Sequence, residues 1–255
     1  LQHAFKILKP KLKEKLSIAV DSSEFFRTTK DGTAIKLGIG SSAAVSVGIT
    51  QALSQYQAIR ASPENLLTQA NSIHQGLQGK RGSGIDVTCC FADQGVIECT
   101  KDSVKNHTWS ILNWPNGLHL KALTTSQYGS TNKLVANYQR ASNLYPKEFR
   151  SALDQFLDIT QSLSNAWKSE DVDLIIDLLS AYDAQIKKLD KIGDIGIYTQ
   201  VHADIQNIAS THNVFYKPSG AGGGDIGLAF SSSLDALSDF SDAIGTDARN
   251  IGCLD

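Results

Sequence analysis

A glycine-containing turn in front of a long apolar segment constrains the fold of this chain more than any other feature. Gly38 and Gly40 precede residues 41–59, which are rich in apolar and small side chains and contain no proline. The apolar residues recur at helical spacing, which predicts a mostly buried helix. The glycines allow positive φ angles, and the helix behind them would offer free N–H groups to an anion. The segment therefore predicts either a phosphate-binding loop, in which Ser41 and Ser42 bind phosphate or Mg²⁺, or a plain turn before a serine-capped helix.

A second glycine-containing segment carries charged side chains. Lys80 and Arg81 are followed by Ser83 between two glycines and by Asp86, all within seven residues. By itself this pattern is typical of a surface loop with solvated charges and a helix-capping serine or aspartate. A binding role for it depends on the rest of the chain.

The third segment is the run Lys-Pro-Ser-Gly-Ala-Gly-Gly-Gly-Asp at residues 217–225. Four glycines in five positions cost much conformational entropy on folding. Strand-like apolar runs flank the segment at residues 214–216 and 226–230, whereas a free linker is polar on both sides. Backbone N–H groups in such a loop can form a concavity that binds anions, and we favour this interpretation over a flexible loop tip.

The remaining patterns predict a mixed fold. Strands are expected at residues 16–26, 95–99, 118–124, 214–216 and 226–230. Helices are expected at residues 41–59 and 62–75, along the apolar stripes of residues 156–167 and 172–189, and from residue 232. Strands and helices alternate only loosely, which indicates an α+β or α/β class. The turn cluster at residues 113–117 is the expected domain boundary, because the chain is mainly helical after it.

Composition excludes several classes of protein. The chain has 24 Lys and Arg against 26 Asp and Glu, whereas a nucleic-acid-binding protein carries a basic excess. No apolar run is long enough to cross a bilayer and no secretory leader opens the sequence, so we expect a cytoplasmic protein without a membrane partner. The four cysteines contain no C-x-x-C pair and are expected to be reduced. The six histidines show no metal-binding spacing and are expected to be ordinary core or surface residues.

Together the glycine segments resemble those of the GHMP small-molecule kinases. Gly-Ile-Gly-Ser-Ser-Ala-Ala at residues 38–44 is similar to the family's phosphate loop. Residues 217–225 look like the last motif of the phosphomevalonate kinases in particular, and residues 82–87 resemble their middle motif. Gly-Ser-Thr at 129–131 stands where the family has an Ala-Ser-Thr element. The family's N-terminal Pro-Gly-Lys motif has no counterpart here, and the chain contains no methionine, so an incomplete chain is expected.

The resemblance implies an α+β fold with two lobes. The N-terminal α/β lobe at residues 1–116 would hold the phosphate loop, and residues 117–255 would form the C-terminal α+β lobe. The active site is expected in the cleft where the three glycine segments meet. The implied reaction moves the γ-phosphoryl group of ATP onto the phosphate of 5-phosphomevalonate. A GHMP kinase that phosphorylates an alcohol, such as mevalonate or a sugar, and a non-catalytic GHMP homologue remain alternatives.

The resemblance also implies roles for individual residues. The acceptor phosphate is largely ionised at neutral pH because its second pKa is about 6, so Asp86 is expected to position groups rather than to remove a proton. Asp86 and Lys217 are the expected catalytic residues, and Mg²⁺ would bind Ser42 and Asp86. ATP would bind Gly38, Ile39, Gly40, Ser41, Ser42 and Ala43. The acceptor would bind Lys80, Arg81, Ser83, Ser130, Thr131, Lys217, Ser219, Gly220, Ala221 and Gly222. The expected partners are ATP, Mg²⁺ and this small molecule, and the expected state is a monomer or homodimer.

Overall fold

The chain forms two compact units. The computed structural model describes all residues except 1, 11–14, 29–31, 33, 59, 79–82, 93–94, 102–106, 126–128, 225, 245–248 and 255. The first unit spans Leu1–Leu112 and the second Asn113–Asp255. The turn cluster at which the sequence analysis places a boundary opens the second unit. Both units combine helices with antiparallel strand pairs, so the α+β class is confirmed. None of the helices in the described ranges is both long and apolar enough to span a bilayer.

The first unit is mainly helical. Its helices are α1 (Gln2–Leu8), α2 (Ser41–Tyr56), α3 (Pro63–Gln78) and α4 (Ile85–Ala92). Two antiparallel pairs complete it, β1 (Phe26–Thr28) with β2 (Ala34–Lys36) and β3 (Val96–Lys101) with β4 (His107–Leu112). The predicted starts of α2 and α3 are confirmed, and the amide of Asn65 donates to Ser62 Oγ over 3.4 Å at the head of α3.

The predicted strand at residues 16–26 is wrong. Residues 15–22 have no regular structure, and a 3-10 turn, η1 (Ser23–Phe25), follows. Asp21 Oδ1 accepts a hydrogen bond from the Ser23 amide over 2.9 Å, and such a local bond competes with strand pairing. The apolar side chains of Leu16 and Ile18 instead pack against the cluster that includes Ile49 and Leu53 of α2.

A second buried cluster fixes the three longer helices of this unit against one another. Ala43 and Val47 of α2 pack with Ala70 of α3 and Val87 of α4. All four side chains are at most 4% exposed. Because Ala43 and Val87 lie in the first turns of their helices, this packing holds the start of α4 next to the start of α2.

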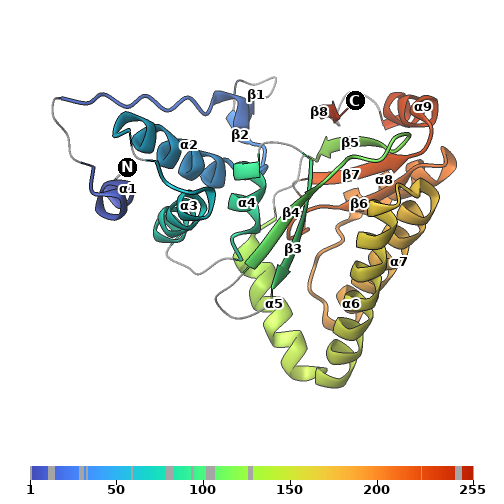
Figure 1. Cartoon of the computed structure of the whole chain (residues 1–255). Helices are drawn as coiled ribbons and strands as arrows, with labels where there is room; N and C mark the ends of the chain where they lie inside the picture. Colours follow the sequence, from blue (N-terminus) through green and yellow to red (C-terminus); the bar gives the residue numbers. More distant parts are fainter. Residues whose placement is uncertain are drawn as a thin grey trace. The chain divides into compact units, whose positions relative to one another are not determined.

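The second unit contains a four-stranded antiparallel sheet. Its strand order is β6 (Phe215–Pro218), β7 (Ile226–Ser231), β5 (His119–Thr124) and β8 (Arg249–Leu254). Helices α8 (Gln200–Thr211) and α9 (Leu234–Ile244) pack against the sheet around buried Tyr216, Ala229 and Phe240 (Figure 1). The strands expected near residues 118, 214 and 226 are confirmed. The sheet places β6 next to β7, so the glycine-rich connection between these strands turns back sharply.

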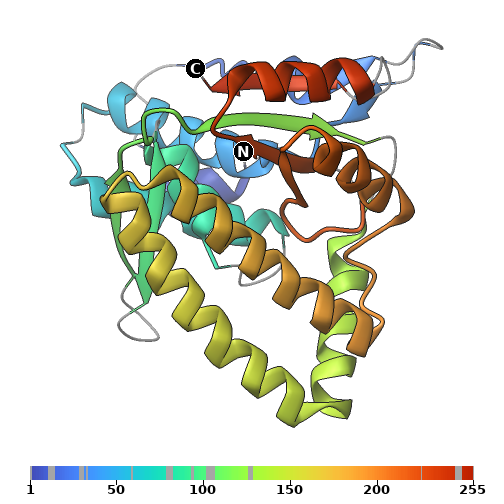
Figure 2. The same ribbon diagram turned by 90° about the vertical axis from the view of Figure 1, so that its right-hand side faces the viewer.

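Three further helices extend the second unit. They are α5 (Thr131–Leu144), α6 (Pro146–Lys168) and α7 (Val172–Gly193). Helices α6 and α7 run side by side (Figure 2), and the helices predicted along the apolar stripes of residues 156–167 and 172–189 are confirmed. Leu134 and Ala141 of α5 and Phe149 of α6 share a buried cluster with Leu189 of α7. This cluster fixes the N-terminal end of α5, which carries a candidate binding segment.

Candidate functional site

The turn in front of α2 has the conformation that its glycines allow. Gly38 and Gly40 have φ angles of +74° and +85°, and the Gly40 carbonyl accepts hydrogen bonds from the amides of Ala43 and Ala44. Gly40 is the N-cap, and no side chain caps the helix. The alternative of a serine-capped helix is therefore wrong, because Ser41 and Ser42 already lie in the first turn of the helix. An N-terminus without a side-chain cap keeps N–H groups available to an anion.

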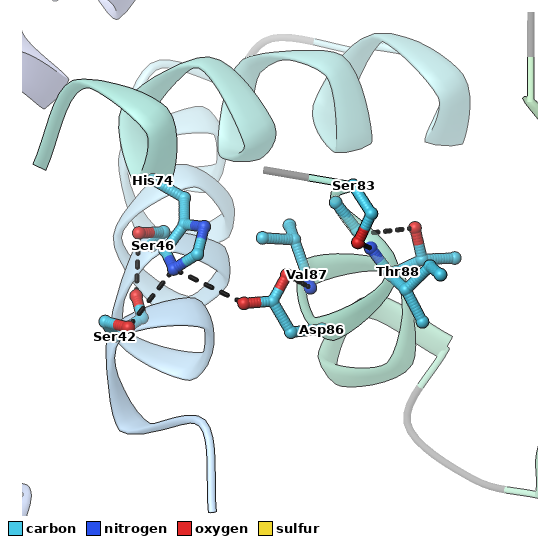
Figure 3. A network of polar contacts seen from close by, with 9 residues as sticks. Ser42, Ser46, His74, Ser83, Asp86, Val87 and Thr88 are labelled. Carbon is cyan, nitrogen blue, oxygen red and sulfur yellow. Dashed lines mark hydrogen bonds and ion pairs between the residues drawn. The ribbon is translucent and has the colours of Figure 1, made fainter. Parts of the chain in front are cut away.

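Three side chains from three helices meet beside this turn. Ser42 Oγ of α2 lies 3.1 Å from His74 Nε2 of α3, and Asp86 Oδ2 of α4 lies 3.5 Å from the same nitrogen (Figure 3). The His74 side chain is 5% exposed and that of Asp86 46%. The arrangement thus presents a carboxylate to solvent and supports it with a buried ring.

The local structure of the second glycine segment orients Asp86. Asp86 lies in the first turn of α4, where its Oδ1 accepts a hydrogen bond from the Val87 amide over 2.9 Å. Gly84 has a φ of +77°, and a Cβ there would lie 2.6 Å from Asn71 Oδ1. The Ser83 hydroxyl oxygen lies 3.5 Å from the Ile85 amide at the start of the helix. The positive end of the helix dipole favours a negative charge at this position.

His74 is a buried residue of α3 that lies at the candidate site. The sequence predicts an ordinary core or surface histidine here, because no metal-binding spacing marks it. Its position in the helix is the one sequence feature that indicates burial. Ala70 and Ile73 define the buried face of α3, and His74 lies on that face. A buried polar ring needs partners, and two of its partners come from the predicted phosphate loop and the predicted carboxylate.

The donor set at this point fits Mg²⁺. Magnesium usually binds one or two protein oxygen ligands together with substrate phosphates and water. Ser42 supplies a hydroxyl oxygen and Asp86 a half-exposed carboxylate, both next to His74. Within the described ranges no cluster of three or more His, Cys, Asp or Glu could hold a metal ion. Ser42 and Asp86 would supply the protein ligands of such a site, and substrate phosphates and water would supply the others.

The glycine loop of the second unit, residues 219–224, leaves two backbone donors available. Its glycines all have positive φ angles, from +65° to +131°. The Ser219 amide donates to the Ile226 carbonyl over 2.9 Å, and the Gly223 amide donates to the Ile197 carbonyl over 2.8 Å. In the part of the chain that the structure describes, the amides of Gly220 and Ala221 donate to no acceptor. Neighbouring free amides of this kind are the basis of an anion-binding concavity.

The start of α5 touches this loop. A Cβ on Gly129 would collide with the carbonyl oxygen of Gly222, so the two backbones are in direct contact. Ser130 is the N-cap of α5, and its Oγ accepts a hydrogen bond from the Lys133 amide over 3.4 Å. Thr131 is the first residue of the helix. The structure therefore brings Ser130 and Thr131 together with the glycine loop, as expected of residues that share a ligand.

Lys217 is a part-buried cation at the entry to the glycine loop. Its Nζ donates to the Pro218 carbonyl over 2.7 Å. Burial lowers the pKa of this ammonium group, and the charge of Asp183 opposes that shift. The side chain also lines a pocket of about 200 Å³ with Ile197, Tyr198 and the glycine loop. Lys80 and Arg81, the other expected cations, lie outside the described residues.

A likeness to a known family lies in the first 94 residues of the chain. Residues 2–94, which include the turn at Gly40 and the Ser42, His74 and Asp86 side chains, match the GHMP kinases N terminal domain. In these residues the chain resembles the GHMP kinases. The chain also resembles the phosphomevalonate kinase of Streptomyces sp. (strain CL190), with 27% identity over 84% of this chain. The chain spans 60% of the length of that relative.

Solved structures support the same fold. The Lin0012 protein from Listeria innocua has a TM-score of 0.77 and 22% identity to this chain, and the match covers 88% of this chain and 68% of that protein. Streptococcus pneumoniae phosphomevalonate kinase in complex with phosphomevalonate and AMPPNP has a TM-score of 0.73 and 18% identity. It covers 86% of this chain and 69% of its own. These likenesses confirm the α+β GHMP kinase fold.

Proposed function

We propose that this protein is a GHMP kinase that transfers the γ-phosphoryl group of ATP to the phosphate of 5-phosphomevalonate, forming 5-diphosphomevalonate. The observation that carries the proposal is the anion-binding arrangement of the second unit. The free amides of Gly220 and Ala221 lie in a loop that touches the start of α5 and begins beside Lys217. An acceptor that already carries a phosphate needs such donors, whereas an alcohol does not. The similarity to a Streptomyces phosphomevalonate kinase supports this choice.

The first unit would bind the nucleotide. The triphosphate would lie on residues 38–43, where the backbone turn and the first turn of α2 offer N–H groups to phosphate oxygens. Ser42 and Asp86 would hold Mg²⁺, which neutralises phosphate charge when it is bound. His74 would keep the Ser42 hydroxyl and the Asp86 carboxylate in place through its Nε2 contacts.

The second unit would orient the acceptor. The acceptor phosphate is largely ionised at neutral pH because its second pKa is about 6. One of its oxygens would attack the γ-phosphorus as the bond from that phosphorus to the β,γ-bridging oxygen breaks and ADP leaves. Lys217, Ser219 and the free loop amides would hold the acceptor phosphate, and Asp86 would position groups without taking a proton. Positioning and charge neutralisation account for most of catalysis in phosphoryl transfer.

The choice of acceptor is the direct test of the proposal. We expect steady-state assays that measure ADP formation to show turnover with 5-phosphomevalonate and none above background with mevalonate. Turnover with mevalonate in preference would contradict the proposal and indicate an alcohol-phosphorylating GHMP kinase. ATP binding without turnover of either compound would indicate a non-catalytic homologue.

Removal of the Lys217 cation is expected to impair use of the phosphorylated acceptor. We expect Lys217→Ala to lower kcat/KM for 5-phosphomevalonate by about tenfold or more, because a charge-assisted hydrogen bond contributes about 1.5–3 kcal/mol. Because burial lowers the pKa of Lys217, the cation is lost at a lower pH than that of an exposed lysine. The wild-type rate should therefore fall at alkaline pH. Lys217→Arg should move that fall to higher pH, since a guanidinium stays charged.

Lys121 provides a matched control for this experiment. It is a part-buried lysine on β5 of the same sheet, and its Nζ contacts Ser241 Oγ at 2.5 Å. Lys121→Ala should leave kcat/KM for 5-phosphomevalonate within about twofold, as expected for a lysine whose contacts are structural. If Lys217→Ala behaves like the control, Lys217 has no role in acceptor binding.

We also propose that the protein works in the cytoplasm. Among the cysteines whose side chains the structure describes, Cys89, Cys90 and Cys99 are free thiols, which fits a reducing compartment. The expected state of monomer or homodimer stays a prediction.

A further inference from the structure

His202 lies fully buried on α8, next to the glycine loop. Its Nδ1 lies 2.9 Å from the Tyr216 hydroxyl oxygen, and its Nε2 lies 3.0 Å from the Gly224 carbonyl oxygen. A carbonyl oxygen only accepts hydrogen bonds, so Nε2 carries the hydrogen in this pair. In the neutral ring Nδ1 then accepts from the Tyr216 hydroxyl. Burial raises the pKa of that hydroxyl, which keeps its proton available for this bond.

Close packing and hydrogen bonds also fix the residues around His202. The Tyr216 ring lies against the backbone of Gly227 on β7, where any Cβ would collide with the hydroxyl. Gln206, one turn further along α8, donates to the Tyr216 carbonyl over 2.9 Å and to Asp183 Oδ2 over 3.2 Å. The position of the His202 ring is therefore fixed, so its hydrogen bond can orient the backbone of the glycine loop.

The glycine loop needs contacts of this kind because its glycines give the backbone unusual conformational freedom. Gly224 has a φ of +131°, a conformation that is accessible mainly to glycine. At the neighbouring residue, the Gly223 amide donates to the Ile197 carbonyl. Asp190 Oδ1 in turn accepts hydrogen bonds from the amides of Gly196 and Ile197, over 2.8 and 2.9 Å. The contact of His202 with the Gly224 carbonyl oxygen fixes the backbone two peptides further along the chain.

We propose that His202 is a positioning residue for the acceptor's phosphate: its Nε2–H holds the Gly224 carbonyl, so that the free amides of Gly220 and Ala221 keep the geometry that binds an anion. The proposal rests on the proposed function in so far as the anion is the phosphate of the acceptor. His202 contacts neither substrate nor nucleotide in this role, and it acts through the loop backbone.

Two amide variants separate positioning from packing. In His202→Gln the side-chain amide nitrogen can take the place of Nε2 and still donate to the Gly224 carbonyl. In His202→Asn the amide lies nearer the place of Nδ1 and is too short for that bond. Both variants put a smaller polar side chain into the core, so similar losses in Tm are expected. We expect His202→Asn to raise KM for 5-phosphomevalonate by about tenfold, which corresponds to the loss of one hydrogen bond worth a factor of ten in affinity. In His202→Gln the same KM should stay within about threefold of the wild-type value.

KM for ATP should be unchanged in both variants, because the turn at Gly40 is not touched. Equal effects of the two variants on KM for the acceptor, in proportion to their loss in Tm, would overturn the proposal and leave His202 as a core residue. If His202→Asn does not fold, Tyr216→Phe replaces it, because this change removes the hydroxyl that fixes the ring and keeps the aromatic packing. An unchanged acceptor KM in Tyr216→Phe would then overturn the proposal.

A binding measurement without catalysis distinguishes failure of this inference from failure of the proposed function. Inorganic phosphate is titrated into each protein while the amide NMR signals of Gly220 and Ala221 are followed. Wild type and His202→Gln should show saturable shifts of these signals, and His202→Asn should need about tenfold more phosphate, matching the kinetic effect. Such a result supports the positioning role even if 5-phosphomevalonate proves not to be the acceptor. No shift of these amides in wild type would overturn it.

Discussion

Replacement of Gly40 by valine is expected to lower the affinity for ATP by about a hundredfold or more, since loss of a phosphate-binding backbone geometry removes several charge-assisted hydrogen bonds. Gly40 has a φ of +85°, which a β-branched residue adopts only with strain. The space around a Cβ at this position is open, so the valine side chain would occupy the space in which the phosphates are proposed to bind. Isothermal titration calorimetry with ATP and Mg²⁺ measures the change.

Gly32 provides the control for backbone strain. It has the same φ of +85° and equally open space around a Cβ. Gly32→Val should therefore lose a similar amount of stability in thermal unfolding, while its affinity for ATP stays within about twofold of wild type, as for a substitution away from the site. Equal ATP affinities of the Gly40→Val, Gly32→Val and wild-type proteins would mean that the turn before α2 does not bind the nucleotide.

Replacement of Asp86 by asparagine is expected to lower kcat by about a hundredfold or more, because positioning and charge stabilisation each contribute several kcal/mol to such reactions. The amide oxygen of asparagine can still accept the hydrogen bond of the Val87 amide, which Asp86 Oδ1 accepts in the native protein. The start of α4 should therefore stay folded while the negative charge is lost. Steady-state kinetics at saturating ATP and 5-phosphomevalonate measure the effect.

Asp171 is a matched control for the Asp86 experiment. It lies at the start of α7, and its Oδ1 accepts a hydrogen bond from the Leu174 amide over 3.1 Å. Asp171→Asn should leave kcat within about twofold, as expected of a helix cap outside the site. A wild-type rate for Asp86→Asn would show that its carboxylate only stabilises a helix start. An acidic limb of the pH profile that disappears in Asp86→Asn would identify a general base instead of a positioning group.

Local elements and glycine turns could be predicted from the sequence. The spacing of apolar residues predicts the helix that starts at Ser41 and the amphipathic helices α6 and α7. A proline in the first turn predicts the helix that starts at Pro63. Both signals depend only on residues that are close in sequence. The positive φ angles of the glycine loop follow equally from composition, because few other residues adopt them. The family resemblance rests on these same short segments, which explains why it could be drawn without a structure.

The tertiary structure alone decided which polar side chains meet. Ser42, His74 and Asp86 come from three helices, and their contacts depend on the buried packing of α2, α3 and α4. Residues 16–26 also show that local patterns do not decide the final structure. Their alternating pattern is typical of a strand, but a turn at Asp21 and packing against α2 replace the strand. The hold of His202 on Gly224 also depends on the placement of α8 beside the loop. Periodic patterns encode which face of an element is buried, whereas the partner of a buried polar group is set only when separate elements pack together.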